Sequence, residues 1–330
     1  MVKNTMNKKI TFALVLALAV VLVMGSASAG FFDFLTGGSD DTVKIGYLPS
    51  DHDSALFVAD SQKLYEQKGI STELVQFNNG GDLMTAMASG DVDVGYVGIT
   101  PVLSSISAGV PVKVISAAQN EGSGILVTSN SGISDAKDLS GKTIATPGEA
   151  SIQHVLLAVY LKNNGLSLDD VNESAMKVPS INDALKTGNL PAAITFQPYV
   201  SIGQTDESIS ELVDSSEILP GHPCCVVVAS QDFLDNHKDT AKDIIEIHKN
   251  STDYINKQID DGKANEVVKL LPKDIVSNEE AEVDSLSSFP FISGLNDTYK
   301  TNVDEFQKLE VELGLLNKTI PQDTLYWAEA

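Results

Sequence analysis

The segment between residues 83 and 101 constrains the fold more than any other part of the chain. It begins with helix-forming residues, stops at Ser89-Gly90-Asp91, and continues as an apolar run from Val92 to Val97. Such a run is typical of a short buried strand. Thr100-Pro101 follows, and this pair is typical of a helix start, because Thr favours the N-cap and Pro the first helical position. The segment therefore predicts a strand that leads directly onto a helix N-terminus.

This junction is where we expect a ligand site. In open α/β sheets, ligands bind beyond the carboxyl ends of the strands. The free amides at a helix start favour an anion or a polar acceptor. The residues at the junction, Gly98, Ile99 and Thr100, are therefore candidates for ligand binding.

Short apolar strands alternate with amphipathic helices from Val43 onward, which predicts an α/β fold. We expect two lobes, each with a mainly parallel sheet flanked by helices, and two inter-lobe crossings near Ser129 and Val226. The first lobe would comprise residues 43–128 and 226–330, including a C-terminal helical region, and the second lobe residues 129–225. In this scheme, a long helix covers residues 53–67, and His237 and His248 lie on the surface of the C-terminal helices.

The first 29 residues have the order of a signal peptide. Lys3, Lys8 and Lys9 precede an apolar stretch, and Ala27-Ser28-Ala29 is a small-residue cleavage site. We therefore expect a signal peptide over residues 1–29, a linker over residues 30–42, and a secreted, cell-surface or periplasmic protein. The alternative is an uncleaved N-terminal anchor, extended by the phenylalanines that follow the cleavage site.

The charge excludes one class of partner and one kind of anion site. The net charge of −23 excludes nucleic-acid binding, which requires a basic surface. All basic residues apart from histidine are Lys, and the chain contains no Arg. A bidentate guanidinium contact to a carboxylate, sulfonate or phosphate is therefore not available.

The two cysteines are adjacent, at Cys224 and Cys225, and do not form a disulfide framework. Three interpretations remain open from the sequence. The two residues are small apolar residues at the start of a buried strand, or they form a strained vicinal disulfide, or they contact a metal or cofactor.

Polar residues gather in the loops between strands and helices, and each has a structural alternative. Asp, Ser and Thr at these positions also serve as helix caps, and a His is often bonded within the structure. The candidate ligand-binding residues are Ser50, Asp51, His52, Asp53, Gly98, Ile99, Thr100, Asn120, Glu121, Gly148, Ser151, Gln153, His154, Phe196, Gln197, His222 and Cys224.

The run SGDVDVGYVG-TP resembles the substrate-binding proteins of ABC importers for nitrate, sulfonates, taurine and thiamine precursors. The resemblance covers roughly residues 43–230. It implies a two-lobed type II periplasmic-binding-protein fold without catalytic residues, cofactor or metal. It also implies capture of a small anionic or neutral molecule, such as a sulfonate, a nitrate-like anion or a small heterocycle, in an inter-lobe cleft. The partners would be an ABC permease and its ATPase, with membrane contact through the permease or the anchor, and the protein would be a monomer.

One motif departs from this family. Trp-Glu-Pro is common where this chain has Phe196-Gln197-Pro198. An amide in place of the carboxylate disfavours a cationic ligand. Two alternatives are an enzyme similar to thiamine-pyrimidine synthases, a branch that has a Cys cluster and uses iron, and a metal-binding protein that uses His52, His154 and His222 with nearby acids. The G-x-S-x-G and H-E-x-x-H motifs are absent from the sequence.

Overall fold

The computed structural model describes residues 42–330. Residues Val43–Ala330 form one compact unit that contains all the elements below. The signal peptide and nearly all of the linker predicted above lie outside the described residues. Within the described part, every helix is too short or too polar to cross a membrane.

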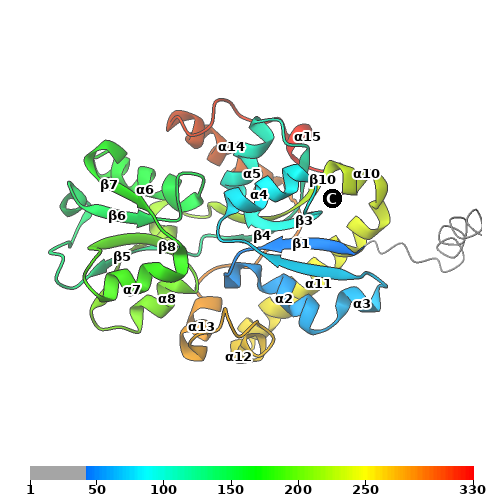
Figure 1. The fold of residues 1–330 in the computed structure, drawn as a ribbon, viewed down its shortest axis with the longest axis horizontal. Coiled ribbons are helices and arrows are strands. Elements are labelled where there is room, and N and C mark those ends of the chain that lie inside the picture. The colour runs from blue at the N-terminus through cyan, green and yellow to red at the C-terminus, as the bar shows by residue number, and fades with distance from the viewer. Residues whose placement is uncertain (1–41) are drawn as a thin grey trace, which may run out of the picture. The chain divides into compact units, whose positions relative to one another are not determined.

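The first lobe is built on a five-stranded sheet with the order β2-β1-β3-β10-β4 (Figure 1). Strand β1 pairs in parallel with β2 and β3, whereas β10 runs antiparallel between β3 and β4. The strands are β1 (Val43–Tyr47), β2 (Thr72–Gln76), β3 (Val94–Gly98), β4 (Val112–Asn120) and β10 (Pro223–Ser230).

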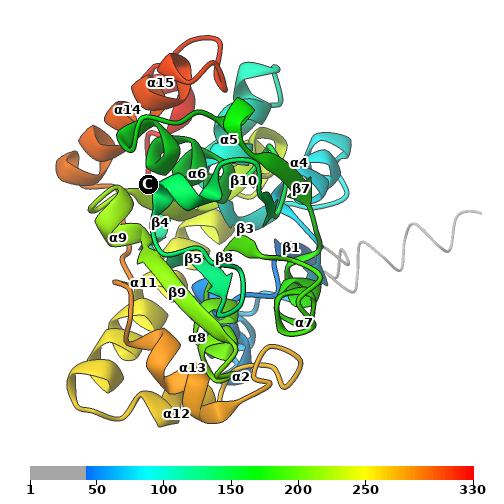
Figure 2. The same cartoon turned by 90° about the vertical axis from the view of Figure 1, so that its left-hand side faces the viewer.

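The second lobe repeats this arrangement in the order β7-β6-β8-β5-β9 (Figure 2). Strand β6 pairs in parallel with β7 and β8, and β5 runs antiparallel between β8 and β9. The strands are β5 (Ser123–Thr128), β6 (Thr143–Thr146), β7 (Asn172–Ala175), β8 (Ala192–Phe196) and β9 (Ile209–Asp214).

The two-lobed α/β prediction is confirmed, with two corrections. The sheets are mixed, because β10 and β5 each return antiparallel between two strands of their sheet. The chain enters the second lobe before β5, whereas the sequence analysis placed residues 123–128 in the first lobe. The reason lies at Glu121-Gly122, where both residues have positive φ, +62° and +78°, and redirect the chain between β4 and β5.

Helices flank both sheets (Figure 1). In the first lobe they are α2 (Ser54–Ser61), α3 (Leu64–Gln67), α4 (Gly80–Ser89) and α5 (Ile99–Ser107), and in the second α6 (Ile152–Asn163), α7 (Ile181–Lys186), α8 (Tyr199–Gln204) and α9 (Ser215–Ile218). The C-terminal region adds α10 (Gln231–Asn236), α11 (Lys238–Asp260), α12 (Ala264–Val268), α13 (Glu279–Leu286), α14 (Asp297–Glu312) and α15 (Gln322–Leu325). Short 3₁₀ helices lie at Asp51–Asp53 (η1), Ala136–Leu139 (η2), Leu168–Asp170 (η3) and Val178–Ser180 (η4).

The helix predicted over residues 53–67 is divided into three parts. The 3₁₀ turn η1 precedes α2, and Lys63, with a φ of +57°, separates α2 from α3. A left-handed residue cannot continue a right-handed helix. The early break leaves the polar turn Asp51–Asp53 as a separate element at the end of β1.

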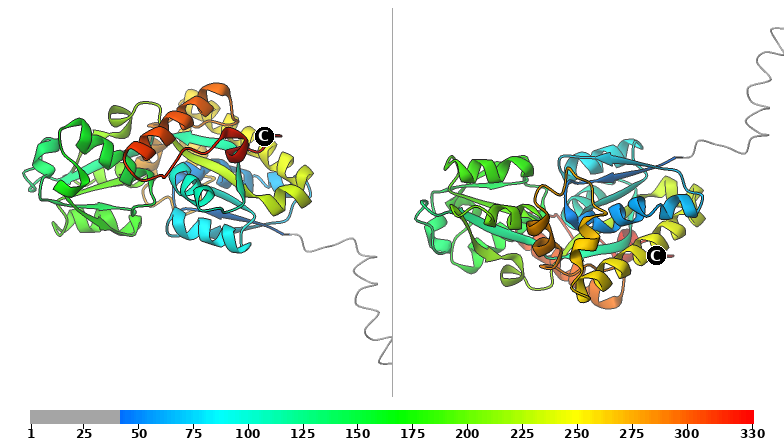
Figure 3. Two further views of the ribbon diagram at one scale, coloured as in Figure 1. Left: turned by 90° about the horizontal axis from the view of Figure 1, so that it is seen from above. Right: turned by 90° about the horizontal axis from the view of Figure 1, so that it is seen from below.

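Helix α11 packs beside α2 along the first lobe (Figure 3). Its His248 was predicted to be a surface residue, but the side chain is fully buried. The ring contacts the Tyr96 hydroxyl through Nδ1 at 3.2 Å and the Ala117 carbonyl through Nε2 at 2.8 Å. Burial lowers the pKa of His248 to about 4. His248 is therefore a neutral core residue rather than a candidate ligand.

The segment from α4 to α5 forms the predicted order of helix, strand and helix, but α5 begins at Ile99 with Gly98 as its N-cap, so Thr100 lies inside the helix and is not the predicted cap. The Asn79 side chain accepts a hydrogen bond from the Asp82 amide at the start of α4, and Gly90 ends the helix with a φ of +80°. Strand β3 is buried throughout, and a Cβ at Gly95 would lie 2.8 Å from Leu83. This close packing of α4 on β3 brings Gly98 and the start of α5 to the carboxyl edge of the sheet.

Candidate functional site

A cavity of about 280 Å³ lies at the carboxyl ends of strands from both sheets. Segments that begin η1, α4, α5 and α6 contribute to its wall, so several helix N-termini face the same space. The lining residues are Leu48, Ser50, His52, Asp53, Asn78, Asn79, Gly80, Gly98, Pro101, Pro147, Gly148, Glu149, Ala150, Ser151, Ile152, Gln153, Val178, Phe196, Cys224 and Cys225.

The turn after β1 supplies the most constrained polar residues of the wall. Ser50 caps η1 by accepting a hydrogen bond from the His52 amide, and its hydroxyl donates to the Gln197 carbonyl of the second lobe at 2.8 Å. Asp53 accepts a hydrogen bond from the Leu48 amide at 3.0 Å. These hydrogen bonds hold the short 3₁₀ turn in one position.

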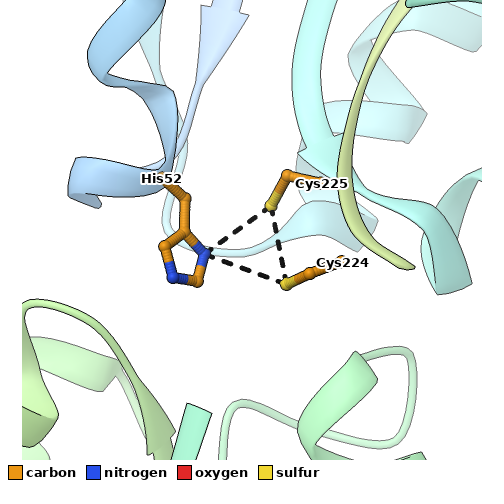
Figure 4. A group of neighbouring side chains, drawn as sticks. All are labelled: His52, Cys224 and Cys225. Carbon is orange, nitrogen blue, oxygen red and sulfur yellow. Dashed lines mark hydrogen bonds between the residues drawn. The ribbon is translucent and has the colours of Figure 1, made fainter. Parts of the chain in front are cut away.

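The turn brings His52 next to the two cysteines on β10. Nδ1 of His52 lies 3.9 Å from the Cys224 sulfur and 3.8 Å from the Cys225 sulfur, and the two sulfurs are 3.9 Å apart. Figure 4 shows the three side chains converging from the η1 turn and from β10. All three residues are buried, and both cysteines are reduced.

The cluster has an uneven distribution of charge. Burial opposes ionisation of the Cys224 thiol, but Cys225 and His52 outweigh it and lower the pKa of Cys224 well below its usual range. The neighbouring Cys224 sulfur and burial raise the pKa of the Cys225 thiol. Burial alone would lower the pKa of His52, but Cys224 and the adjacent aspartates raise it. The cluster therefore favours one thiolate beside an imidazolium.

Three buried acids, Asp51, Asp53 and Glu282, lie near the cluster. Burial raises the pKa of Asp53 well above its usual range and also raises that of Asp51. Ser285 donates a short hydrogen bond to Asp51. Glu282 is fully buried, neither of its carboxyl oxygens has a hydrogen-bond partner, and burial together with Asp51 raises its pKa.

The second lobe contributes the first turn of α6. Ser151 is the N-cap and accepts a hydrogen bond from the His154 amide, while its hydroxyl donates to the Gly148 carbonyl at 2.6 Å. Gln153 is buried, and its amide donates to the Ser123 hydroxyl at 2.9 Å. The first amides of a helix have no partner within the helix, so this turn presents hydrogen-bond donors toward the cavity.

The predicted candidates divide into two groups. Nine of them line the cavity: Ser50, His52, Asp53, Gly98, Gly148, Ser151, Gln153, Phe196 and Cys224. The other eight do not: Asp51, Ile99, Thr100, Asn120, Glu121, His154, Gln197 and His222.

Several excluded side chains have structural partners instead. The Thr100 hydroxyl donates to the Glu310 carboxylate at 2.7 Å. The Gln197 amide accepts from the Ser201 amide group and donates to the Ser288 hydroxyl. Glu310 and Ser288 are distant in the sequence from the residues that they contact, so these two partners could not be identified from local patterns.

Four of the remaining candidates outside the lining also have partners within the structure. Asp51 is bonded to Ser285, and Nδ1 of His154 contacts Glu173 at 2.8 Å. Glu121 accepts from the Gly221 amide, and Nδ1 of His222 contacts the Leu219 carbonyl. Ile99, which is buried, and Asn120, which is half-buried, lie outside the lining as well.

The sequence analysis missed two parts of the wall, Val178 of η4 and the loop after β2. Asn78, Asn79 and Gly80 follow β2 and line the cavity. The signal was present, since Asn is a preferred N-cap and the loop follows a parallel strand of the same sheet. Its position at the same carboxyl edge as Gly98 would have placed it in the site.

The histidines of the proposed metal-binding alternative are separated. Within residues 42–330, the group with metal-ligand spacing consists of His52, Cys224 and Cys225, and His154 and His222 are not part of it. A metal site built from His52, His154 and His222 is therefore not the arrangement that the structure brings together.

Comparisons with known proteins agree with this architecture. The chain is 29% identical over 202 residues to the taurine-binding periplasmic protein of Escherichia coli strain K12, a match that covers 61% of this chain and 62% of the relative. The match thus spans less than two thirds of that relative's length. The name of this relative describes a binding protein.

Two solved structures share the fold. The ligand-binding component of an ABC-type import system from Staphylococcus aureus, solved with zinc bound, has a TM-score of 0.75 at 22% identity, covering 87% of this chain and 97% of that one. The periplasmic aliphatic sulphonate binding protein SsuA from Escherichia coli has a TM-score of 0.72 at 19% identity, covering 87% and 92%.

The sequence profile of the NMT1-like family matches residues 37–272. This region includes both sheets and every residue that lines the cavity. Since the match covers more than half of the chain, the protein belongs to the NMT1-like family.

Proposed function

We propose that this protein is an extracytoplasmic solute-binding protein of an ABC importer, which captures a small molecule in the cavity and delivers it to a permease without changing it. The observation that carries the proposal is a single cavity walled by helix starts from both sheets. A solute in this position would contact both lobes at once. Hinge closure around a bound ligand is a common response of such an arrangement.

The size of the cavity favours a small solute. Sites for drug-sized ligands usually measure about 300–1,000 Å³, and this cavity of about 280 Å³ is at the lower limit. A sulfonate, a nitrate-like anion or a small heterocycle would fit this range. The taurine-binding relative supports the same class of ligand.

The charge of the wall favours an anionic or neutral solute held by hydrogen bonds. The chain has no Arg, and none of the residues that line the cavity in the described part is Lys. Positive potential would therefore come from the amides at the starts of α4, α5 and α6. Burial keeps the acid Asp53 protonated over a wider pH range, which reduces repulsion of an anion.

Location outside the cytoplasmic membrane belongs to the same proposal. It rests on the basic, apolar and small-residue order of residues 1–29. We expect protein isolated from its own host to begin near Gly30, as N-terminal sequencing would show. A cytosolic chain that retains Met1 would contradict this location.

Calorimetric titration tests the proposed capture. Purified protein would be titrated with taurine, a short alkanesulfonate, nitrate and a small pyrimidine. Gln153→Ala would weaken binding several-fold to about tenfold, since one hydrogen bond contributes about 0.5–1.5 kcal/mol. Ala150 lines the cavity and is exposed. The large side chain introduced by Ala150→Trp would therefore fill the cavity and abolish binding.

Gln204→Ala is the matched control, because Gln204 lies on α8 of the second lobe and bonds to Glu211 outside the cavity. Its affinity for the solute should equal that of the unmodified protein. If the Ala150→Trp variant binds the solute as tightly as the unmodified protein, the solute binds outside this cavity. Recovery of a chemically changed solute after incubation would reject a pure binding function.

A further inference from the structure

The His52–Cys224–Cys225 cluster has long sulfur hydrogen bonds, and its spacing also suits a metal centre. Its three donor atoms are separated by 3.8, 3.9 and 3.9 Å. The point equidistant from them lies about 2.2 Å from each, close to the usual distances of about 2.3 Å for Zn–S and 2.0–2.1 Å for Zn–N. An ion would fit between these atoms without a change of backbone.

The backbone explains how two consecutive cysteines face the same side. Neighbouring residues of a regular strand point to opposite faces of the sheet. The pairing of β10 with β4 is irregular on both sides of Cys225. A bulge of this kind redirects a side chain, so both sulfurs face His52 (Figure 4).

The histidine ring is held in the orientation that a metal ligand requires. Nε2 of His52 contacts the Gly122 carbonyl at 3.1 Å. A carbonyl only accepts hydrogen bonds, so Nε2 keeps its proton, and Nδ1, which faces the two sulfurs, is the nitrogen that a metal would coordinate in place of a proton. Metal-ligating histidines typically use the second ring nitrogen in this way. The ring also packs against Phe289, with 4.8 Å between ring centroids.

We propose that His52, Cys224 and Cys225 form a zinc site whose fourth coordination position opens into the cavity. All three residues line that cavity. A Cys₂His set with one open position is an established arrangement for zinc. Sulfur ligands also suit Cu(I). Zinc is favoured because its two charges balance two buried thiolates, whereas Cu(I) would leave a buried negative charge beside Asp51 and Asp53.

The proposal goes beyond solute capture and does not depend on it. Zinc binding is measured with the mature chain, its thiols reduced, in competition with a chromogenic zinc chelator and without any solute. We expect one zinc ion per chain. Cobalt(II) replaces zinc as a spectroscopic probe, and thiolate coordination would give an intense sulfur-to-cobalt charge-transfer band.

Cys224→Ser and Cys225→Ser each remove one sulfur with little change in volume. Loss of an outer-shell partner alone costs about 10–100-fold in metal affinity, so each variant should lose more than about 100-fold, together with the charge-transfer band. His237→Ala is the control, because His237 stacks on Phe233 away from the cluster. It should bind zinc like the unmodified protein.

Unchanged melting temperatures of the metal-free variants would establish that the loss is not caused by unfolding. Failure of the reduced protein to bind zinc, or retained affinity in both serine variants, would overturn the proposal. Tight binding of Cu(I) that zinc cannot displace would overturn the choice of metal. A vicinal disulfide in protein isolated from the host that resists reduction would also overturn the site.

Discussion

The two lobes have the same strand order but present different chemistry to the cavity. In the first lobe, the wall contains a histidine, two cysteines and a buried aspartate. In the second lobe, it contains the N-cap, the first turn of α6 and the loop before it. The shared fold thus fixes where the wall lies, whereas the identity of the residues after each strand fixes what the wall can bind.

The comparison extends to the acids near the wall. In the first lobe, Glu282 lacks a hydrogen-bond partner, and burial and Asp51 raise its pKa. In the second lobe, burial alone would raise the pKa of Glu173, but hydrogen bonds from His154 and Thr146 lower it overall. One lobe holds its acid protonated and the other holds it ionised, so the lobes should respond to pH in opposite directions.

The largest expected loss of stability is that of Gly122→Ala, which tests how closely the first-lobe wall is packed around His52. In Gly122→Ala, the added Cβ would lie 2.5 Å from Nε2 of His52 at a φ of +78°. Left-handed strain costs about 1–2 kcal/mol and overpacking about 1–3 kcal/mol. We expect a loss of about 2–5 kcal/mol in the free energy of unfolding, measured by urea denaturation.

Gly165→Ala in the second lobe is the matched control. Gly165 has a φ of +79° and no atom within 4 Å of the added Cβ. This variant should lose only the strain, about 1–2 kcal/mol. Equal losses in the two variants would show that His52 moves freely and that the first-lobe wall is not tightly packed.

The second expected effect concerns Glu282. An unsatisfied buried polar group costs about 1–3 kcal/mol, so Glu282→Met should increase the stability near pH 8 by a similar amount. Because the folded-state pKa is raised, the stability of the unmodified protein falls as the pH increases from about 4.5 through that pKa. The variant should show a smaller fall when unfolding is measured between pH 5 and pH 9.

A steeper fall in the Glu282→Met variant would contradict this interpretation. Glu279→Met on the same helix is a suitable control, because Glu279 is exposed at the start of α13. Its pH dependence should follow that of the unmodified protein.

The sequence predicted the elements that depend on local patterns. Caps, glycine stops and apolar runs determine α4, β3 and α6 from neighbouring residues. The assignment of β5 to the first lobe was wrong, because an apolar strand fits either sheet. Its partners in the structure are β8 and β9 of the second lobe. Pairs such as Asp51 with Ser285 join residues far apart in the chain. The common orientation of the two cysteines depends on a bulge that the sequence does not indicate.

A smaller effect concerns Thr100, which was predicted to bind the ligand but lies outside the cavity lining. Thr100→Val removes the hydrogen bond to Glu310, whose pKa burial raises to about 7. The hydroxyl lowers this pKa, so it stabilises the ionised form most. We expect a loss of about 0.5–1.5 kcal/mol, larger at pH 8 than at pH 5, with unchanged solute affinity. Weaker solute binding by the Thr100→Val variant would indicate that Thr100 contacts the solute.

The smallest effect lies in the second lobe. Glu173→Gln removes the carboxylate that contacts His154, in a pair whose Glu side chain is 20% exposed. A partly solvated pair contributes less than about 1 kcal/mol. Because the folded-state pKa is lowered, this contribution is present above pH 4.5 and disappears as the pH falls further. If the loss of stability caused by Glu173→Gln increases as the pH falls, the proposed difference in pH response between the two lobes is contradicted.

The position of β10 determines the order in which the lobes can fold. Strand β10 lies between β3 and β4, although the whole second sheet separates it from them in the sequence. The second sheet is made from one continuous segment and can form as soon as β9 has emerged. The first sheet keeps a gap until residues 223–230 arrive. As the chain emerges from its N-terminus, the lobe that begins first therefore completes its sheet last, an exception to the usual N-terminal order of folding.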